Sequence, residues 1–232
     1  MNFKEKLISG ELVKRYKRFF VEVKIGSKTV TAHCPNTGSM MGLIKKGNKV
    51  WLSKSTNPKR KLKYTLEIIE QDKNKVGVNT HSTNKIVYHA LVNSLMQYFK
   101  NLKVIKQEVK YGKNTRFDFL VVKKKKKIFI EVKNVTLLRN KGIAEFPDSV
   151  TSRGLKHIKE LLHAQKRGFL IFIIFVIQRT DCNKFTLAKD IDPKYCEFLT
   201  KAVKKKLNVL CYDCKFSSKG IRLNRRIKFK IK

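Results

Sequence analysis

The stretch FLIFIIFVI at residues 169–177 constrains the fold more than any other part of this sequence. All nine of its residues are apolar, but a helix that spans a bilayer needs about 20 such residues in a row. A short apolar run rich in Ile and Phe is typical of a strand that is buried on both faces. The sequence therefore predicts a globular protein with such a strand at its centre, and no membrane partner.

The first eighty residues show the period-two alternation of β-strands. In RFFVEVKI, apolar Phe19, Val21 and Val23 alternate with the residues between them, and the turn GSK leads into TVTAHC, which is a hairpin signal. Three further stretches resemble strands: KVWLSK, KYTLEIIE and VGVN. Five short strands favour a small barrel or sandwich, and an oligonucleotide-binding (OB) barrel is one member of that group.

Beyond residue 80, apolar residues recur at helical spacing, and Ser82 is a candidate cap for the first helix. The expected buried stripe of this helix is Ile86, Val87, Ala90, Leu91, Leu95 and Tyr98. Further elements alternate along the chain, with strands near 102–110, 116–122, 128–134, 169–177 and 208–214 and helices near 148–167 and 193–206. This order predicts an α/β or α+β domain with a mixed sheet. We expect two domains, 1–80 and 81–232.

The charge balance is strongly basic, with 54 Lys and Arg against 17 Asp and Glu and a net charge of +37. Such a charge attracts polyanions, of which nucleic acid is the commonest for a soluble protein. Most of the basic residues are lysine and Asn and Ile are also frequent, so an AT-rich genome explains the composition equally well. The first twenty residues lack the features of a signal peptide, and we expect a cytoplasmic protein.

Five cysteines, an odd number, fit a reducing compartment. Cys211 and Cys214 form a CxxC pair, and Cys182 and Cys196 lie upstream, so a zinc site with four thiolates is conceivable. Neither upstream cysteine belongs to a second CxxC, however, and VLCYDCKF has the pattern of a strand. We therefore favour structural cysteines over zinc ligands.

The segment FDFLVVKKKKKIFIEVK places three ionisable side chains on two strand-like stretches: Asp118, Glu131 and Lys133. Glu131 and Lys133 are two residues apart, so they share one face of a strand with Phe129. Asp118 joins them only if paired residue numbers across the hairpin sum to 249, because a slip of one residue turns a side chain to the other face. The sequence predicts the 249 register.

Two carboxylates beside a lysine suit a divalent-metal site. Mg²⁺ or Mn²⁺ held by such oxygens can acidify a bound water and neutralise charge on a phosphorus centre, while Lys133 orients that water. The alternative is a solvated hairpin face with weak cross-strand pairs, because an Asp followed by Glu-x-Lys is a short pattern with many chance matches.

Several blocks together resemble the sugar fermentation stimulation protein A family. They are RYKRF (15–19), HCPNTGSM (33–40), EVKYG (108–112), RFDF (116–119), FIEVKNVTL (129–137) and FPDSVTSRGLKHIKEL (146–161). The resemblance implies an N-terminal OB-like barrel, a domain similar to the PD-(D/E)xK nucleases, and a DNA-binding role linked to sugar metabolism. It assigns the two acids and the lysine of the nuclease pattern to Asp118, Glu131 and Lys133. Phe117 stands where that pattern has proline.

Further candidate residues flank the nuclease pattern. Glu108, on the preceding strand, is either another acidic metal ligand or a surface residue paired with a lysine. On the helix near 148–167, Leu155, Ile158 and Leu162 form the expected buried stripe, with Asp148 as the N-cap. Arg153 and His157 then fall on the opposite, solvated face, where they can contact phosphate.

In the barrel, RYKRF interleaves Arg15, Lys17 and Arg18 with the aromatic residues Tyr16 and Phe19. Cations and aromatic rings in this mixture bind single strands with little sequence preference, although Phe19 also fits the core of the strand. HCPNTGSM reads first as a turn, and the resemblance makes Asn36 and Thr37 candidate DNA contacts.

Three functions stay open at this stage. The first is a metal-dependent nuclease that acts on DNA. The second is a DNA-binding regulator that keeps the nuclease-like fold but does not cleave DNA. The third is a basic protein associated with RNA or the ribosome, although the sequence contains no motif that indicates it. We expect DNA recognition without strong sequence preference, since no helix-turn-helix signature is present. The sequence leaves the oligomeric state open, a homodimer included.

Overall fold

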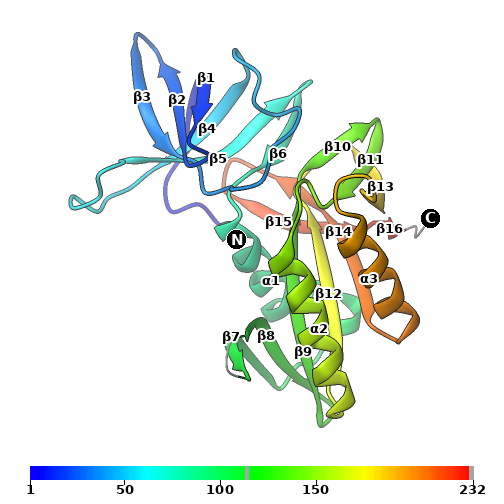
Figure 1. The fold of residues 1–232 in the computed structure, drawn as a ribbon. Coiled ribbons are helices and arrows are strands. Elements are labelled where there is room, and N and C mark those ends of the chain that lie inside the picture. Colours follow the sequence, from blue (N-terminus) through cyan, green and yellow to red (C-terminus); the bar gives the residue numbers. More distant parts are fainter. Residues whose placement is uncertain (113–114, 230–232) are drawn as a thin grey trace.

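A computed structural model describes residues 1–112 and 115–229, which form a β-barrel and a larger α/β unit (Figure 1). The strands of the barrel are β1 Ile8–Tyr16, β2 Phe20–Ile25, β3 Lys28–His33, β4 Lys49–Lys54, β5 Tyr64–Gln71 and β6 Asn74–Gly77. They pair in the order β3-β2-β1-β4-β5-β6, and a second pairing between β3 and β5 closes the barrel. The OB-like barrel is therefore confirmed.

Two features of the barrel differ from the sequence prediction. The strand β1 was not expected, because Gly10 and the charged residues Glu11, Lys14 and Arg15 obscure its alternation. Phe19, expected as a candidate for the core, is 47% exposed at the end of the β1–β2 turn, while Val21 and Val23 fill the interior as predicted.

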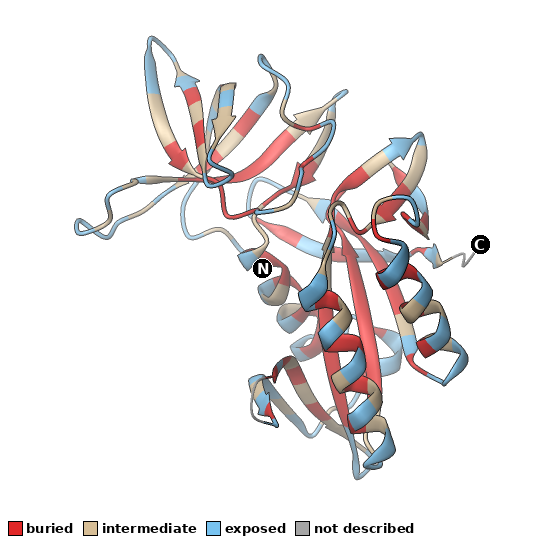
Figure 2. Cartoon of the chain, in the orientation of Figure 1, coloured by how far each residue is buried: buried red, intermediate tan, exposed pale blue. Residues whose placement is uncertain are grey.

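The larger unit is built on a six-stranded mixed sheet in the order β15-β14-β12-β9-β8-β7. Its strands are β7 Val104–Tyr111, β8 Thr115–Lys123, β9 Lys126–Val135, β12 Leu170–Ile177, β14 Asn208–Phe216 and β15 Ile221–Arg226. β12 is parallel to both of its neighbours and is buried on both faces, as its apolar sequence predicted (Figure 2). A smaller sheet holds β10 Leu137–Asn140, β11 Gly142–Phe146, β13 Cys182–Leu187 and β16 Lys228–Phe229.

Helices cover both faces of the main sheet. They are α1 His81–Val92, the short 3₁₀ helix η1 Gln97–Phe99, α2 Ser152–Lys166 and α3 Pro193–Lys204. Alternate residues of β12 point to opposite sides: Ile173 and Phe175 pack with α2 and α3, whereas Ile174 and Val176 pack with α1. Among the described residues, no helix has the length and apolarity that a membrane crossing demands.

The limits of the helices correct several expectations. α1 ends at Val92, so Leu95 and Tyr98 lie beyond it and are 50% and 41% exposed instead of buried. Thr80, not Ser82, stands at its N-cap. Likewise α2 begins at Ser152, where the Thr151 hydroxyl caps it by accepting from the Gly154 N–H.

The cysteines are all buried free thiols. Cys211 lies in the core beneath α2 and α3, and Cys214 lies in the core beneath α1. The two thiols of the CxxC pair therefore point to opposite faces of β14 and cannot share one zinc ion, which supports their structural role.

The barrel is attached to the α/β unit by residues at the end of β12. Gly77 donates its N–H to the Gln178 carbonyl, and Val76 forms an isolated β-bridge with Arg179. The buried Arg179 guanidinium also donates to Gln71 Oε1 of the barrel, at 3.0 Å, and to Asp181. These contacts fix the barrel beside the carboxyl end of β9 and β12.

Candidate metal and nucleic-acid site

The hairpin of β8 and β9 has the predicted register. Its paired residues run from Lys123 and Lys126 to Phe119 and Ile130, and each pair sums to 249. Pairing stops at Phe119, the residue that directly follows Asp118 in the sequence. Instead of a ladder bond, the Val132 N–H donates to Asp118 Oδ2 at 2.6 Å. The carboxylate of Asp118 therefore takes the ladder position of a backbone carbonyl at the point where the two strands separate.

The opening of the hairpin also changes the direction of the β8 side chains. Phe117 packs in the core beneath α2, whereas Phe119, two residues later, packs in the core beneath α1. In a regular strand both would share one face. The irregularity at Asp118 places this carboxylate between the two faces, at the edge of a cavity that Glu131 and Lys133 also line.

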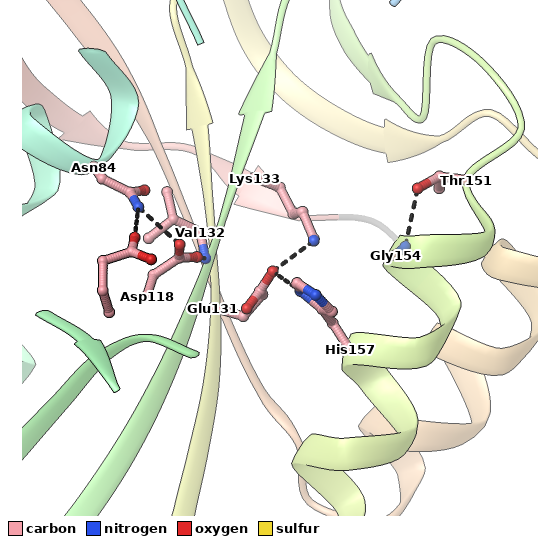
Figure 3. A network of polar contacts seen from close by, with 9 residues as sticks. Asn84, Asp118, Glu131, Val132, Lys133, Thr151, Gly154 and His157 are labelled. Atoms are coloured by element: carbon pink, nitrogen blue, oxygen red, sulfur yellow. Dashed lines mark hydrogen bonds and ion pairs between the residues drawn. The ribbon is translucent and has the colours of Figure 1, made fainter. Parts of the chain in front are cut away.

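Glu131 and Lys133 face the same side of β9, as predicted. Lys133 Nζ lies 2.7 Å from Glu131 Oε1, and the Glu131 side chain is only 3% exposed. His157 Nδ1, on α2, contacts the same carboxylate oxygen (Figure 3). Glu131 Oε2 is buried without a hydrogen-bond partner.

The position of His157 contradicts the sequence analysis. The buried residues of α2 are Gly154, His157, Ile158, Leu161 and Ala164, so the true stripe is displaced from Leu155 and Leu162. His157 lies on the sheet side of the helix and not on a solvated face. A buried imidazole is tolerated there because the Glu131 carboxylate partners it.

The two acids differ in their electrostatics. Burial, followed by repulsion from Glu131, raises the pKa of Asp118 to about 6, although hydrogen bonds from Val132 and Asn84 act the other way. Burial also opposes ionisation of Glu131, but the charge of Lys133 and the contact with His157 outweigh it and lower its pKa. Glu131 is thus stabilised as a carboxylate, whereas Asp118 is destabilised as one.

Glu108 lies beside this pair without joining it closely. Asn84 Nδ2, from α1, donates to Asp118 Oδ1 at 2.7 Å and to Glu108 Oε1 at 3.4 Å. The Glu108 carboxylate is half-exposed and lies 3.7 Å from the Arg116 guanidinium. Within residues 1–112 and 115–229, no three or more His, Cys, Asp or Glu side chains are grouped as a metal site by themselves. Glu108 as a metal ligand stays a prediction.

The acids open onto two adjoining cavities. The first, of about 650 Å³, is lined by Asp118, Glu131 and Lys133 together with residues of the barrel, α1 and the loop before α2. The second, of about 560 Å³, shares Asp118 and Glu108 with it and carries cationic side chains. Those side chains are Lys110, Arg116, Arg153 and Lys156. Arg153 lines both cavities.

The barrel residues selected from the sequence divide into three groups. Asn36 and Thr37 line the first cavity, so the structure brings them to the acids. The Arg15 guanidinium instead donates to the backbone carbonyls of residues 18, 36, 38 and 39, including Asn36 at 2.7 Å. Lys17 and Arg18 occupy the exposed β1–β2 turn with φ of 47° and 59° and line neither cavity.

Two residues of the site were not found from the sequence. Asn84 is one polar residue on an amphipathic helix, and nothing in its spacing distinguishes it from a solvated one. Tyr195, on α3, is fully buried against Phe146, and its hydroxyl has no hydrogen-bond partner. Burial and the nearby charge of Glu131 raise its pKa well above the usual range, so the hydroxyl stays protonated beside the site.

A closed OB barrel followed by a mixed-sheet domain, with two acids and a lysine at the opening of a hairpin, defines a class: an OB domain joined to a restriction-endonuclease-like domain. Residues 13–78 match the N-terminal OB domain of SfsA, and residues 81–220 match the sugar fermentation stimulation protein RE domain. The chain belongs to the sugar fermentation stimulation protein family, as the sequence blocks indicated.

Individual relatives cover the whole chain. A sugar fermentation stimulation protein homolog of Pelagibacter ubique is 56% identical over 228 residues, 98% of either chain. A homolog of Maricaulis maris is 41% identical and covers 100% of this chain and 99% of the relative. SfsA of Pyrococcus furiosus, solved in complex with Ca²⁺, superposes with a TM-score of 0.90 at 25% identity, covering 100% of this chain and 98% of that one.

Proposed function

We propose that this protein is a cytoplasmic, divalent-metal-dependent nuclease that acts on DNA with little sequence preference. In this proposal residues 1–80 form the OB domain that holds the nucleic acid, and residues 81–232 form the catalytic domain. The observation that carries the proposal is the opened β8–β9 hairpin, where Asp118 and Glu131 line one cavity with Lys133. A carboxylate that burial destabilises, at the edge of a cavity and beside a second charged group, is typical of functional sites.

The residues present fit a hard divalent cation. Glu131 Oε2 is a buried carboxylate oxygen without a partner, and the pKa of Asp118 is raised by burial and by the neighbouring carboxylate. A cation would satisfy the first and relieve the repulsion that acts on the second. The Ca²⁺ complex of the Pyrococcus relative supports binding of a divalent ion, and we propose Mg²⁺ or Mn²⁺ with Asp118 and Glu131 as ligands and Glu108 as a further candidate.

Bound there, the ion would supply an acidified water and positive charge near the phosphodiester. Lys133 is held 2.7 Å from Glu131 and is therefore positioned to orient a water or to stabilise negative charge on phosphate. His157 contacts the same oxygen of Glu131 as Lys133 does, which restricts the rotamers of this carboxylate. Arg153 lies at both cavities, where it can contact phosphates that flank the reacting one.

A cleavage assay with matched variants tests the proposal. Purified protein is incubated with plasmid, DNA oligonucleotides and RNA, with Mg²⁺, with Mn²⁺ or with chelator. Asp118→Ala and Lys133→Ala remove site residues, and Glu197→Gln, an exposed residue on α3, is the control. We expect metal-dependent DNA cleavage by the wild type and the control, and loss of cleavage in both site variants.

The alternative from the sequence, a regulator of sugar-metabolism genes that binds DNA without cutting, predicts a different result. Each of the four proteins would retain DNA equally, and none would cleave it under any metal condition. That outcome would refute the nuclease. Cleavage that survives in Asp118→Ala would point to a contaminating enzyme and would equally remove the support for this site.

A further inference from the structure

One segment of the barrel, residues 35–40, crosses the cavity that contains the acids; we call it the crossing segment. At one end, the Thr80 hydroxyl, next to the start of α1, donates to the Pro35 carbonyl. At the other end, the Met40 N–H donates to Asp148 Oδ2 at 3.4 Å, in the loop before α2. Between these two anchors, Asn36, Thr37 and Gly38 line the cavity.

The two anchors lie on opposite sides of the sheet. α1 packs against one face of β9 and β12, and α2 packs against the other. The crossing segment therefore extends from one helix layer to the other, across the cavity that Glu131 and Lys133 also line. The cavity is lined by residues of β9, by the starts of both helices and by the crossing segment, which we regard as its roof.

The roof is held rigidly. Arg15 donates to the carbonyls of Asn36 at 2.7 Å, Gly38 at 3.1 Å and Ser39 at 3.2 Å, so one guanidinium fixes most of the segment. The Asn36 side chain also accepts from the Gly38 N–H at 2.9 Å. At Gly38 the segment touches the opposite loop so closely that an added Cβ would lie 2.3 Å from Asp148 Oδ2.

The cavity is small. Its volume of about 650 Å³ is in the range of pockets that hold one small molecule, about 300–1,000 Å³. One or two nucleotides of a single strand fit such a volume, whereas a duplex with two backbones and a wide major groove does not. The cations Lys110, Arg116 and Arg153 lie at the second cavity, which no described barrel residue lines, and they place positive charge beside the acids.

We propose that the site takes a single DNA strand, which enters by its end from the second cavity and passes beneath the crossing segment. This deepens the proposed nuclease function by naming its substrate, and it rests on that function only for the cleavage step. Beside the carboxylates of Glu108, Asp118, Glu131 and Asp148, the lining offers short polar side chains and cations, and Phe146 is the one Phe, Tyr or Trp along its described residues. Such a path binds phosphates and not bases.

A reversible lock tests this path. The ideal Cβ position at Gly38 lies 2.9 Å from Asp148 Cγ, so Gly38→Cys combined with Asp148→Cys places two thiols within bonding reach after small rotamer changes. The five native cysteines are buried, which limits competing disulfides. Oxidation then closes the crossing segment covalently, and reduction reopens it. Each single-cysteine variant, treated with the same oxidant, is the control.

The readout must report on the cavity, because a chain of charge +37 also binds DNA elsewhere. Linear single strands, circular single strands of the same sequence and blunt duplexes therefore carry 4-thiothymidine, and crosslinked peptides are identified by mass spectrometry. An Asp118→Asn background in Ca²⁺ prevents cleavage. We expect linear strands to crosslink to the crossing segment in oxidised and reduced protein. Circles should crosslink at least tenfold less in the oxidised protein and recover on reduction.

Three outcomes would overturn the inference. In the first, circles or duplexes crosslink to the locked protein as well as linear strands do. In the second, the lock also prevents linear strands from crosslinking, and in the third the wild-type protein crosslinks duplexes in preference to single strands. Should the double variant fail to fold or oxidise, Asp148→Ala frees one anchor and must raise crosslinking of circles relative to linear strands; an unchanged ratio refutes the path. Crosslinking as expected without any cleavage by the wild type would refute only the nuclease.

Discussion

Asp118 is the residue whose replacement gives the most informative result. Its pKa is raised from 3.8 to about 6, first by burial and then by repulsion from Glu131. A shift of about 2 units corresponds to about 3 kcal/mol, by which the ionised carboxylate destabilises the metal-free protein at neutral pH. Asp118→Asn removes this charge. The amide cannot accept from both Val132 and Asn84, however, and one lost hydrogen bond costs about 1 kcal/mol.

The net expectation is that Asp118→Asn stabilises the metal-free protein by about 1–2 kcal/mol at pH 7.5. The effect must also depend on pH. Between pH 3.8 and about 6 the folded protein holds a proton on Asp118 that the unfolded chain has released, so wild-type stability falls as pH rises through this range. At pH 4.5 the cost of ionisation is only about 1 kcal/mol. The advantage of the variant should therefore shrink by about 2 kcal/mol between pH 7.5 and pH 4.5.

Urea unfolding in chelator at both pH values measures these differences, with Glu197→Gln as the control. Because the lost hydrogen bond contributes equally at both pH values, the change with pH isolates the charge. A variant that is less stable than wild type by the same amount at pH 7.5 and pH 4.5 would refute the reasoning. Added Mg²⁺ or Ca²⁺ should stabilise wild type and not Asp118→Asn, because the ion binds the folded site.

Three further predictions concern residues around the acids. His157→Ala should weaken metal binding about 10- to 100-fold in calorimetry, since Glu131 loses the group that holds it, and His157→Gln, which can still donate to this carboxylate, should recover part of the loss. Arg15→Ala should lower the free energy of unfolding by about 1.5–3 kcal/mol and speed amide exchange at Gly38; slow exchange in the variant would contradict the structural role. Arg153→Ala should reduce the slope of log affinity against log salt by about 1 for DNA, and an unchanged slope would exclude a phosphate contact.

Local pattern was sufficient for those parts of the site that depend on one strand or one hairpin. The apolar run at 169–177 identified β12, and the alternation of β9 placed Glu131 and Lys133 on one face. The register predicted for the hairpin, with paired residue numbers that sum to 249, is the one observed. None of these inferences needed to know which elements meet in space.

His157 shows why the remainder could not be predicted. On the helix alone, the three leucine and isoleucine positions appear to define the buried stripe, and an imidazole is expected to face solvent. The stripe is displaced for two reasons. Gly154 lets the helix approach the ring of Tyr195 closely, since a Cβ added at Gly154 would lie 3.0 Å from Tyr195 Cε2, and the Glu131 carboxylate contacts the His157 imidazole. Both causes lie on other elements, so the periodicity of α2 carries no trace of them.

The roles of the two arginines, Arg15 and Arg153, also depend on which elements meet in the fold. Arg15 sits among basic and aromatic residues that match a nucleic-acid surface, yet its guanidinium is satisfied by backbone carbonyls and holds the crossing segment in place. Arg153 sits in an ordinary amphipathic helix, yet it reaches both cavities. A net charge of +37 cannot distinguish a structural arginine from one that contacts phosphate. The sequence determines the charge of a side chain, but the fold determines its partner. If Arg15 acts on DNA, it does so through the roof that it supports, and its replacement should alter which strands enter the cavity more than how strongly the surface attracts them.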